Sequence, residues 1–290
     1  MVAKLKPYQY GVALNLSDCF APLGGYSLAK RFTFPGGEQH ITLPELPYVD
    51  SVLLTVRFTN ADDLMNTLLT ADALRREGYR VGLFAPYIPY ARQDRVSVKG
   101  EPLSIAVLAD LLNSCEFNDV YGLDAHSDVA PALIRNYRPL DWLKFAKAAC
   151  SEIEGGRDMS TLVGGVPVLI APDAGAVKKV AALAHSRHCD MVQGRKYRDP
   201  NTGQVSISVD VPSYYKHAIV VDDICDGGAT FMDLPSQVKC KIHLVVTHGI
   251  FSKGLKPLFD AGYESIHTTD SWGGSIPGRQ NFYVHEVPVE

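Results

Sequence analysis

The stretch "HAIVVDDICDGGATF" (residues 217–231) decides how the fold is read. An apolar run comes first, two adjacent aspartates (Asp222 and Asp223) follow, and the glycine-bearing segment "DGGAT" (226–230) comes next. The apolar run is rich in β-branched residues and predicts a buried strand that ends at the two aspartates. Small residues just after such a strand let backbone N–H groups converge on an anion. In open α/β sheets, ligands bind at the carboxyl ends of strands, so the end of this predicted strand is a candidate ligand site.

Strand-like apolar runs alternate with helix-like segments along the chain. Strand-like runs lie at 51–58, 79–87, 118–127, 166–175, 241–249 and 264–270, helix-like segments at 61–78, 101–115 and 176–188, and a β-arm at 190–211. This alternation predicts parallel sheets that are covered by helices on both faces. Proline and polar residues interrupt it at "NYRPLDW" (136–142). We therefore expect two α/β domains, residues 1–138 and 139–290, each a mostly parallel sheet flanked by helices.

The composition restricts the classes of partner. The chain has 290 residues, 46% of them hydrophobic, and a formal net charge of -4. A charge this small gives no whole-protein case for binding nucleic acid or a membrane surface. No apolar run approaches the ~18 residues of a transmembrane helix, and the N-terminus has no apolar signal core. The six cysteines show no CxxC pair and no spacing typical of zinc, so we expect reduced thiols in a cytoplasmic protein.

The residues of the opening stretch suit a sugar phosphate. Carboxylates accept hydrogen bonds from sugar hydroxyls, and the backbone of a glycine loop can bind the phosphate. The candidate residues are Asp222, Asp223, Asp226, Gly227, Gly228, Ala229 and Thr230. A capped turn with solvated acids is the alternative that the stretch alone leaves open.

Two basic segments suit phosphate groups. In "PYIPYARQDR" (86–95), Arg92 and Arg95 can bind phosphate in a bidentate manner, and Gln93 can contact the edge of a base. The segment "GRKYRDPNTG" (194–203) is basic in a slightly acidic chain. As a mobile arm it could close over transferring phosphates and stabilise their charge. A polar surface loop and a solvated hairpin, respectively, are the alternatives.

Three further polar residues follow apolar strands. Asp124 and His126 lie in "GLDAHSD" (122–128), and Asp173 lies in "APDAG" (171–175). Carboxylates suit Mg²⁺, which often keeps water ligands and shares substrate phosphates. Histidine is a less usual Mg²⁺ ligand and is more often structural or solvated, so chemistry alone leaves the role of His126 open.

Taken together and in order, these segments resemble the ribose-phosphate pyrophosphokinase (phosphoribosyl pyrophosphate synthetase) family over roughly residues 31–271. The similar segments are "NADDLMNTLLTADALRREGYRVGLFAPYIPYARQDR", "GLDAHS", "APDAGAVKKV", "VVDDICDGGAT" and "THGIF". The glycine loop is also the fingerprint of type I phosphoribosyltransferases. The resemblance implies two phosphoribosyltransferase-like domains that use Mg²⁺ and transfer the β,γ-diphosphoryl group of ATP to the C1 hydroxyl of ribose 5-phosphate. The products would be phosphoribosyl diphosphate and AMP.

The resemblance also assigns roles to residues by their position in the motifs. It places Phe34, Glu38, Arg92, Gln93 and Arg95 on the ATP side, His126 and Asp173 at Mg²⁺, Lys196 and Arg198 in a catalytic arm, and Asp222, Asp223 and Asp226 through Thr230 at ribose 5-phosphate. Diphosphoryl transfer needs in-line placement and charge neutralisation more than a covalent intermediate. A basic arm and Mg²⁺ would supply that charge.

The sequence departs from the family pattern in several places. Gly36 in "FPGGE" stands where the family usually has aspartate, Gly227 replaces a threonine, and Ala229 replaces a glycine. Ala229 is expected to add a Cβ at a crowded backbone position. Pro235 predicts a short or interrupted helix after the loop. The sequence stops at "FYVHEVPVE" without the family's usual final helix, which bears on the homo-oligomer (dimer or hexamer) that the resemblance implies.

Two other functions are compatible with the fold. One is a non-catalytic regulatory subunit of such synthetases, against which the retention of Arg92, His126, Asp173, Lys196 and Arg198 argues. The other is a phosphoribosyltransferase, against which the "ARQDR" segment argues, because a transferase would not need a separate ATP site.

Overall fold

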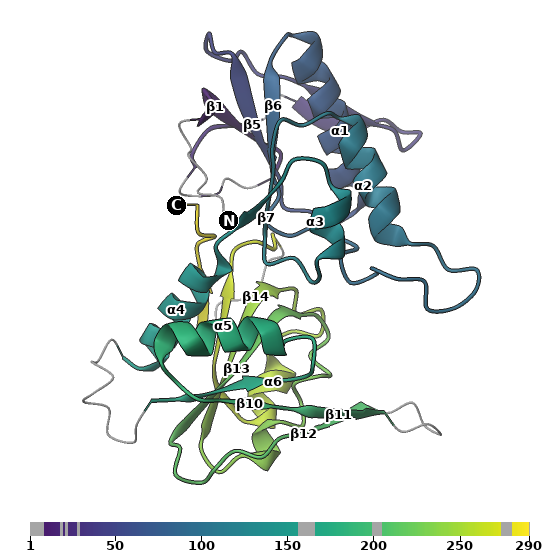
Figure 1. The fold of residues 1–290 in the computed structure, drawn as a ribbon. Coiled ribbons are helices and arrows are strands. Elements are labelled where there is room, and N and C mark those ends of the chain that lie inside the picture. The colour runs from purple at the N-terminus through teal and green to yellow at the C-terminus, as the bar shows by residue number, and fades with distance from the viewer. Residues whose placement is uncertain are drawn as a thin grey trace. The chain divides into compact units, whose positions relative to one another are not determined.

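The computed structural model describes residues 9–17, 20, 23–27, 30–155, 166–198, 205–273 and 280–289. The chain divides into two compact units (Figure 1). Unit 1 comprises Met1–Trp142, Asp270–Gly274 and Glu286–Glu290, and unit 2 comprises Leu143–Thr269 and Ser275–His285. This division differs from a single boundary after residue 138, because two C-terminal segments return to unit 1. Each unit contains a six-stranded parallel sheet with helices, which confirms the predicted fold class.

The sheet of unit 1 has the strand order β2-β1-β5-β6-β7-β8, and all its pairings are parallel. Its strands are β1 (Val12–Asn15), β2 (Tyr26–Ser27), β5 (Ser51–Thr55), β6 (Arg80–Phe84), β7 (Val120–Leu123) and β8 (Tyr137–Leu140). Its helices are α1 (Ala61–Arg76), α2 (Ser104–Ser114) and α3 (Val129–Leu133). Strands β3 (Lys30–Thr33) and β4 (Gln39–Thr42) form a separate antiparallel hairpin.

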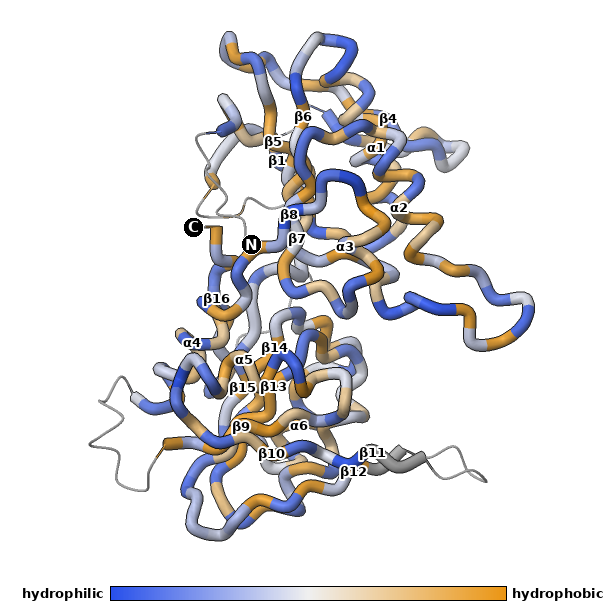
Figure 2. The backbone as a smooth tube through the Cα atoms, viewed as in Figure 1, coloured by the Kyte–Doolittle hydropathy of each residue, from blue (hydrophilic) through white to orange (hydrophobic). Residues whose placement is uncertain are grey.

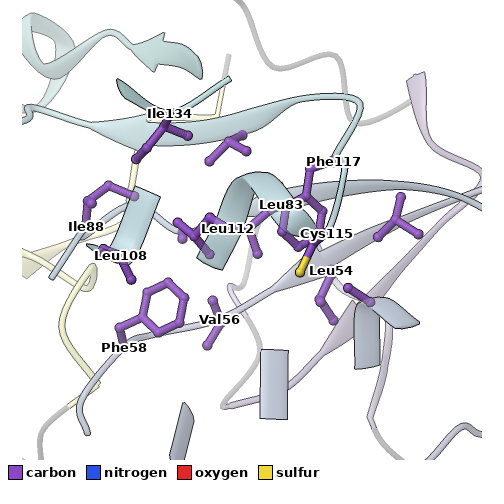
Figure 3. Close-up of a cluster of buried hydrophobic side chains, with 14 of the residues drawn as sticks. Leu54, Val56, Phe58, Leu83, Ile88, Leu108, Leu112, Cys115, Phe117 and Ile134 are labelled. Carbon is purple, nitrogen blue, oxygen red and sulfur yellow. The ribbon is translucent and has the colours of Figure 1, made fainter. Parts of the chain in front are cut away.

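Helix α1 shows why these residues form these elements. The Asn60 side chain accepts a hydrogen bond from the Asp63 backbone N–H at 3.1 Å, and Asp63 Oδ2 accepts one from the Asn60 N–H at 3.3 Å. This reciprocal capping box satisfies N–H groups that the first helical turn leaves unpaired. Buried side chains of α1, α2 and the sheet then form the core of unit 1, and Figure 3 shows part of this cluster, including Leu54, Leu83 and Leu112.

The sheet of unit 2 has the order β10-β9-β13-β14-β15-β16 and is again parallel throughout. Its strands are β9 (Val168–Ala171), β10 (Met191–Gln193), β13 (His217–Cys225), β14 (Lys241–Gly249), β15 (Tyr263–Thr269) and β16 (Phe282–His285). Its helices are α4 (Trp142–Ile153), which starts at the end of unit 1, α5 (Val177–Arg187) and α6 (Lys256–Ala261). Hydrophobic residues run along the central strands, as Figure 2 shows at β13.

Two sequence predictions for unit 2 are confirmed. The β-arm is an antiparallel hairpin of β11 (Arg195–Arg198) and β12 (Val205–Ser208); its expected turn at 199–203 lies outside the described residues. After the glycine loop, Pro235 begins a short 3₁₀ helix, Pro235–Gln237. Within the part of the chain that the structure describes, no helix has the length and apolar character needed to cross a membrane.

Candidate active site

The glycine loop of unit 2 follows β13 at the carboxyl end of the sheet. Gly228 has a φ of +77°, and a Cβ on it would lie 3.3 Å from Leu258 Cδ2. The Phe231 backbone N–H donates to the Gly228 carbonyl at 2.9 Å and closes the turn. Only glycine adopts this conformation without strain. Gly228 therefore sets the path of the loop.

The two aspartates lie inside the strand, so the prediction that the strand ends at them is wrong. Strand β13 continues to Cys225, and its pairing with β14 includes Ile224 with His248. Asp223 is buried, and Asp222 Oδ1 accepts a hydrogen bond from the Asp223 N–H at 2.9 Å. Burial, followed by the neighbouring charge of Asp223, raises the pKa of Asp222 well above its usual value. A carboxyl group of this kind can donate as well as accept when it meets a hydroxyl.

The two departures in the loop have different structural effects from those expected. Ala229 is an exposed residue, which disagrees with the expectation that it occupies a crowded position. Gly227 is not among the glycines with positive φ, and a Cβ on it would lie 3.5 Å from Lys253 Cε, an ordinary contact. The backbone geometry therefore requires neither glycine at position 227 nor alanine at position 229.

A second loop of unit 2 lies beside the glycine loop. The N–H groups of Ile250 and Phe251 donate to the Cys225 carbonyl at 2.9 and 3.0 Å, so the chain after β14 is tied to the end of β13. This places the stem of exposed Lys253 against Gly227. The sequence pattern did not predict a functional role for Lys253. The feature that could have indicated one is its position two residues after the segment "THGIF".

Asp173 lies in the turn after β9. Its Oδ1 accepts hydrogen bonds from the Gly175 and Ala176 N–H groups at 3.0 and 3.3 Å, so the carboxylate is fixed where α5 begins. The arm starts next to this turn, because the Gly194 N–H donates to the Ala171 carbonyl at 2.7 Å. A Cβ on Gly194 would lie 2.5 Å from the Pro172 carbonyl oxygen, so glycine is required for this approach.

The two expected catalytic residues lie on the arm. Lys196 and Arg198 belong to β11, where the backbone pairs them with Ile207 and Val205 of β12. The side chains of Lys196 and Arg198 lie outside what the structure describes, so their catalytic role stays a prediction.

The "ARQDR" segment of unit 1 is a loop after β6. The Gln93 N–H donates to the Tyr90 carbonyl at 2.8 Å, and the Gln93 side chain accepts a hydrogen bond from the hydroxyl of Ser104, the first residue of α2. Arg92 and Arg95 are exposed. The loop is thus attached to α2 through Gln93, while both guanidinium groups reach the surface.

The turn that contains His126 follows β7, the neighbour of β6. The Leu123 N–H donates to the Pro86 carbonyl at 2.8 Å, which joins this turn to the "ARQDR" loop. Asp124 is buried at a φ of 48°, and His126 is exposed. Aspartate is among the residues other than glycine that adopt a left-handed backbone most readily, so Asp124 shapes this turn.

Phe34 and Glu38 flank the turn of the β3–β4 hairpin. The Phe34 N–H donates to the Glu38 carbonyl at 2.8 Å, and the Phe34 ring packs against Phe32 at a centroid distance of 4.7 Å. Phe34 is still 43% exposed, which leaves a ring face for a planar ligand. A Cβ on Gly36 would meet no atom within 4 Å, so the structure gives no steric reason for glycine there.

The candidate residues therefore form two groups. Phe34, Glu38, Arg92, Gln93, Arg95 and His126 belong to unit 1, and Asp173, Lys196, Arg198 and residues 222–230 belong to unit 2. In unit 1 the "ARQDR" loop and the His126 turn follow the neighbouring strands β6 and β7, and in unit 2 the Asp173 turn and the glycine loop follow the neighbouring strands β9 and β13.

Comparison with known proteins finds similarity to ribose-phosphate pyrophosphokinases. The model of the N-terminal domain of ribose phosphate pyrophosphokinase matches residues 29–115. A ribose-phosphate pyrophosphokinase of Pyrococcus furiosus is 26% identical over 259 residues, which are 87% of this chain and 87% of that relative. One from Bradyrhizobium diazoefficiens is 30% identical over 210 residues, which are 70% of this chain and 63% of that relative. The chain is therefore similar to ribose-phosphate pyrophosphokinases over most of its length.

The fold agrees with this family. The crystal structure of phosphoribosylpyrophosphate synthetase from Mycobacterium smegmatis matches with a TM-score of 0.76 and 22% sequence identity, and the match covers 94% of this chain and 93% of that chain. The matched N-terminal domain includes the β3–β4 hairpin and the "ARQDR" loop. The family's recognition from sequence is therefore confirmed.

Proposed function

We propose that this chain is a ribose-phosphate diphosphokinase, which transfers the β,γ-diphosphoryl group of ATP to the C1 hydroxyl of ribose 5-phosphate. The observation that carries the proposal is the glycine loop at the end of β13. The left-handed Gly228 turns the loop directly after a strand that contains the Asp222–Asp223 pair. Hydroxyl acceptors beside a phosphate-binding loop suit a sugar phosphate, and the relatives are named for this activity.

On the acceptor side, each group has a role that its chemistry supports. The N–H groups of residues 226–230 would bind the 5-phosphate, as backbone amides do in anion-binding loops. Asp222 and Asp223 would hydrogen-bond the ribose hydroxyls and fix the sugar. Lys253 would add a positive charge next to Gly227, where the family's threonine hydroxyl is missing. These residues would promote the reaction by placing the C1 hydroxyl of ribose 5-phosphate, not by forming a covalent intermediate.

On the ATP side, Phe34 would stack on the adenine, Glu38 would contact the same moiety, and Arg92, Gln93 and Arg95 would bind phosphates and base. Mg²⁺ is proposed as the metal, with His126 and Asp173 at its positions. The exposed imidazole of unit 1 and the carboxylate of unit 2, which two amides orient, are each compatible with a Mg²⁺ ion that keeps several waters. Bound Mg²⁺ would neutralise charge on the diphosphoryl group.

The arm would supply charge during transfer. Lys196 and Arg198 would stabilise the transferring phosphates in the transition state. Movement of the β11–β12 hairpin would bring these two side chains to the phosphates. We include in this proposal a cytoplasmic location and a homo-oligomer, a dimer or a hexamer. Cys115, Cys150, Cys189 and Cys240 have free thiols, as in a reducing compartment.

One assay tests the function. The purified chain is incubated with ATP, Mg²⁺ and ribose 5-phosphate, and AMP and phosphoribosyl diphosphate are quantified together. We expect equal amounts of both products. AMP formation that fails in a folded preparation contradicts the proposal and favours the regulatory subunit. Consumption of added phosphoribosyl diphosphate with a nucleobase would indicate a transferase instead.

A further inference from the structure

Four histidines form a row across adjacent strands of the unit 2 sheet. His217 Nδ1 on β13 lies 3.0 Å from His243 Nε2 on β14, and His243 Nδ1 lies 2.8 Å from Ser265 Oγ on β15. Ser265 Oγ lies 3.0 Å from His267 Nε2, and His267 Nδ1 lies 3.3 Å from His285 Nε2 on β16. The proposed transfer of a diphosphoryl group from ATP to ribose 5-phosphate uses none of these side chains.

At one end of the row three ligand-type atoms converge. Glu152 Oε2, on α4, lies 3.7 Å from His267 Nδ1 and 3.4 Å from His285 Nε2. Together with the 3.3 Å between the two nitrogens, these distances form a nearly regular triangle. Two ligand atoms that bind a tetrahedral Zn²⁺ at 2.0–2.1 Å lie about 3.3–3.4 Å apart. The triangle therefore has the size of one face of a zinc coordination sphere.

The surroundings hold the two imidazoles in place. The His267 ring stacks on Tyr283 at 4.5 Å with an interplanar angle of 10°, and the His285 ring meets Phe145 edge-on at 5.3 Å. Ser265 holds the other nitrogen of His267, which fixes its tautomer in the way that outer-shell partners of metal-binding histidines do. Burial lowers the pKa of His267 to about 3 and lowers that of His285.

We propose that Glu152, His267 and His285 bind a divalent transition-metal ion, with Zn²⁺ the best fit. If the row were only a chain of hydrogen bonds, each ring nitrogen would have one partner. His285 Nε2 instead faces two, His267 Nδ1 and Glu152 Oε2, which is the arrangement expected around a shared ion. Two imidazoles and one carboxylate are ligands that zinc accepts, with water as the fourth. Solvent reaches the site, because the side chains of Glu152 and His285 are 43% and 18% exposed. The ion would join α4 to β15 and β16.

Titration of the untagged, chelator-treated full chain with Zn²⁺, at saturating Mg²⁺, tests this site. We expect one Zn²⁺ per chain. Glu152→Gln and His285→Ala should each weaken binding by at least ~10-fold, and Ser265→Ala by ~10–100-fold because it removes an outer-shell partner. His185→Ala is the matched control: His185 is exposed on α5 of the same unit, and its loss should leave the affinity unchanged.

Three results would overturn the site. One is the absence of stoichiometric Zn²⁺ binding, and another is wild-type affinity in Glu152→Gln, which alters an exposed side chain and should fold normally. The third is a thiolate-to-metal charge-transfer band after Co²⁺ replaces Zn²⁺, because the metal would then be held by cysteine. A Co²⁺ spectrum of nitrogen and oxygen ligands is expected.

Discussion

Arg57 and Asp270 form a two-pronged contact within unit 1 across 213 positions of sequence. Arg57 Nε donates to the Asp270 carbonyl at 2.7 Å, and Nη2 donates to Asp270 Oδ2 at 2.8 Å. The guanidinium carbon also lies 3.7 Å from the centre of the Phe20 ring. Asp270 Oδ1 accepts the Val287 N–H at 2.7 Å. A single ion pair thus fixes both C-terminal segments that return to unit 1.

Arg57→Ala should destabilise unit 1 by about 3 kcal/mol, because it leaves a carboxylate without its buried partner. Denaturant unfolding followed by tryptophan fluorescence measures this, since Trp142 and Trp272 both belong to unit 1. Arg76→Ala removes an exposed pair with Asp72 and should leave the unfolding midpoint unchanged. Equal effects of the two substitutions would contradict a special role for Arg57.

Lys253→Ala should raise KM for ribose 5-phosphate by about 10-fold, because it removes a charged donor beside the phosphate loop. Steady-state kinetics with each substrate varied in turn should show little change in KM for ATP. Lys256→Ala serves as the control, since Lys256 lies three positions away and pairs with Asp260. An unchanged KM in Lys253→Ala would remove Lys253 from the phosphate site.

Asp222→Asn should reduce kcat/KM for ribose 5-phosphate by about 10-fold while KM for ATP stays near the wild-type value. The substitution keeps the size of the side chain and replaces one carboxyl oxygen, which can accept a hydrogen bond from a sugar hydroxyl, with an NH₂ group that can only donate. Asp233→Asn, at an exposed position after the loop, should have no effect. Equal losses for both substrates would count against assigning this pair to the sugar.

Lys196→Ala should lower kcat by about 100-fold or more with little change in either KM, because the arm would contact the substrates most strongly in the transition state. Single-turnover measurements of AMP formation separate this effect from product release. Lys239→Ala changes an exposed lysine elsewhere in unit 2 and is expected to be neutral. An effect confined to KM would contradict the catalytic role.

Acid should destabilise unit 2 through His243. Burial, followed by the positive charges of His217 and Lys241 against the opposing effect of Glu264, lowers the pKa of His243 to about 4. Below pH 6.5 the unfolded chain takes up the proton more readily than the folded one. The free energy of unfolding should therefore fall between pH 6.5 and 4, by up to ~3 kcal/mol from this residue. Urea unfolding of chelator-treated His243→Gln should show a shallower pH dependence than wild type, and His185→Gln should match wild type.

Much of the fold could be predicted because buried strands and capped helices have characteristic patterns of apolar and polar residues in the sequence. The apolar runs at β6, β9 and β14 became strands, and the acidic start of α1 became a capping box. The end of β13 could not be placed, because adjacent carboxylates suggest a strand end. The strand nevertheless continues to Cys225, because its backbone pairs in parallel with β14 as far as that residue.

The candidate site was predictable only where it follows motifs. Gly228 lies in a recognisable loop, whereas Lys253 approaches that loop through a hydrogen-bonded turn at Cys225 that no local pattern encodes. The trio of Glu152, His267 and His285 was missed for a related reason. Its members come from a helix and two strands, so no short spacing of the kind typical of zinc motifs joins them.

The return of the C-terminal segment to unit 1 has a consequence for synthesis on the ribosome. Val287 and Val289 pack in one cluster with Tyr10, Phe20 and Leu53. Unit 1 therefore cannot complete its hydrophobic interior until residues 287–289 have been translated. Until then its nascent form would present an apolar surface to chaperones, and an early stop codon would harm the half of the molecule that was made first.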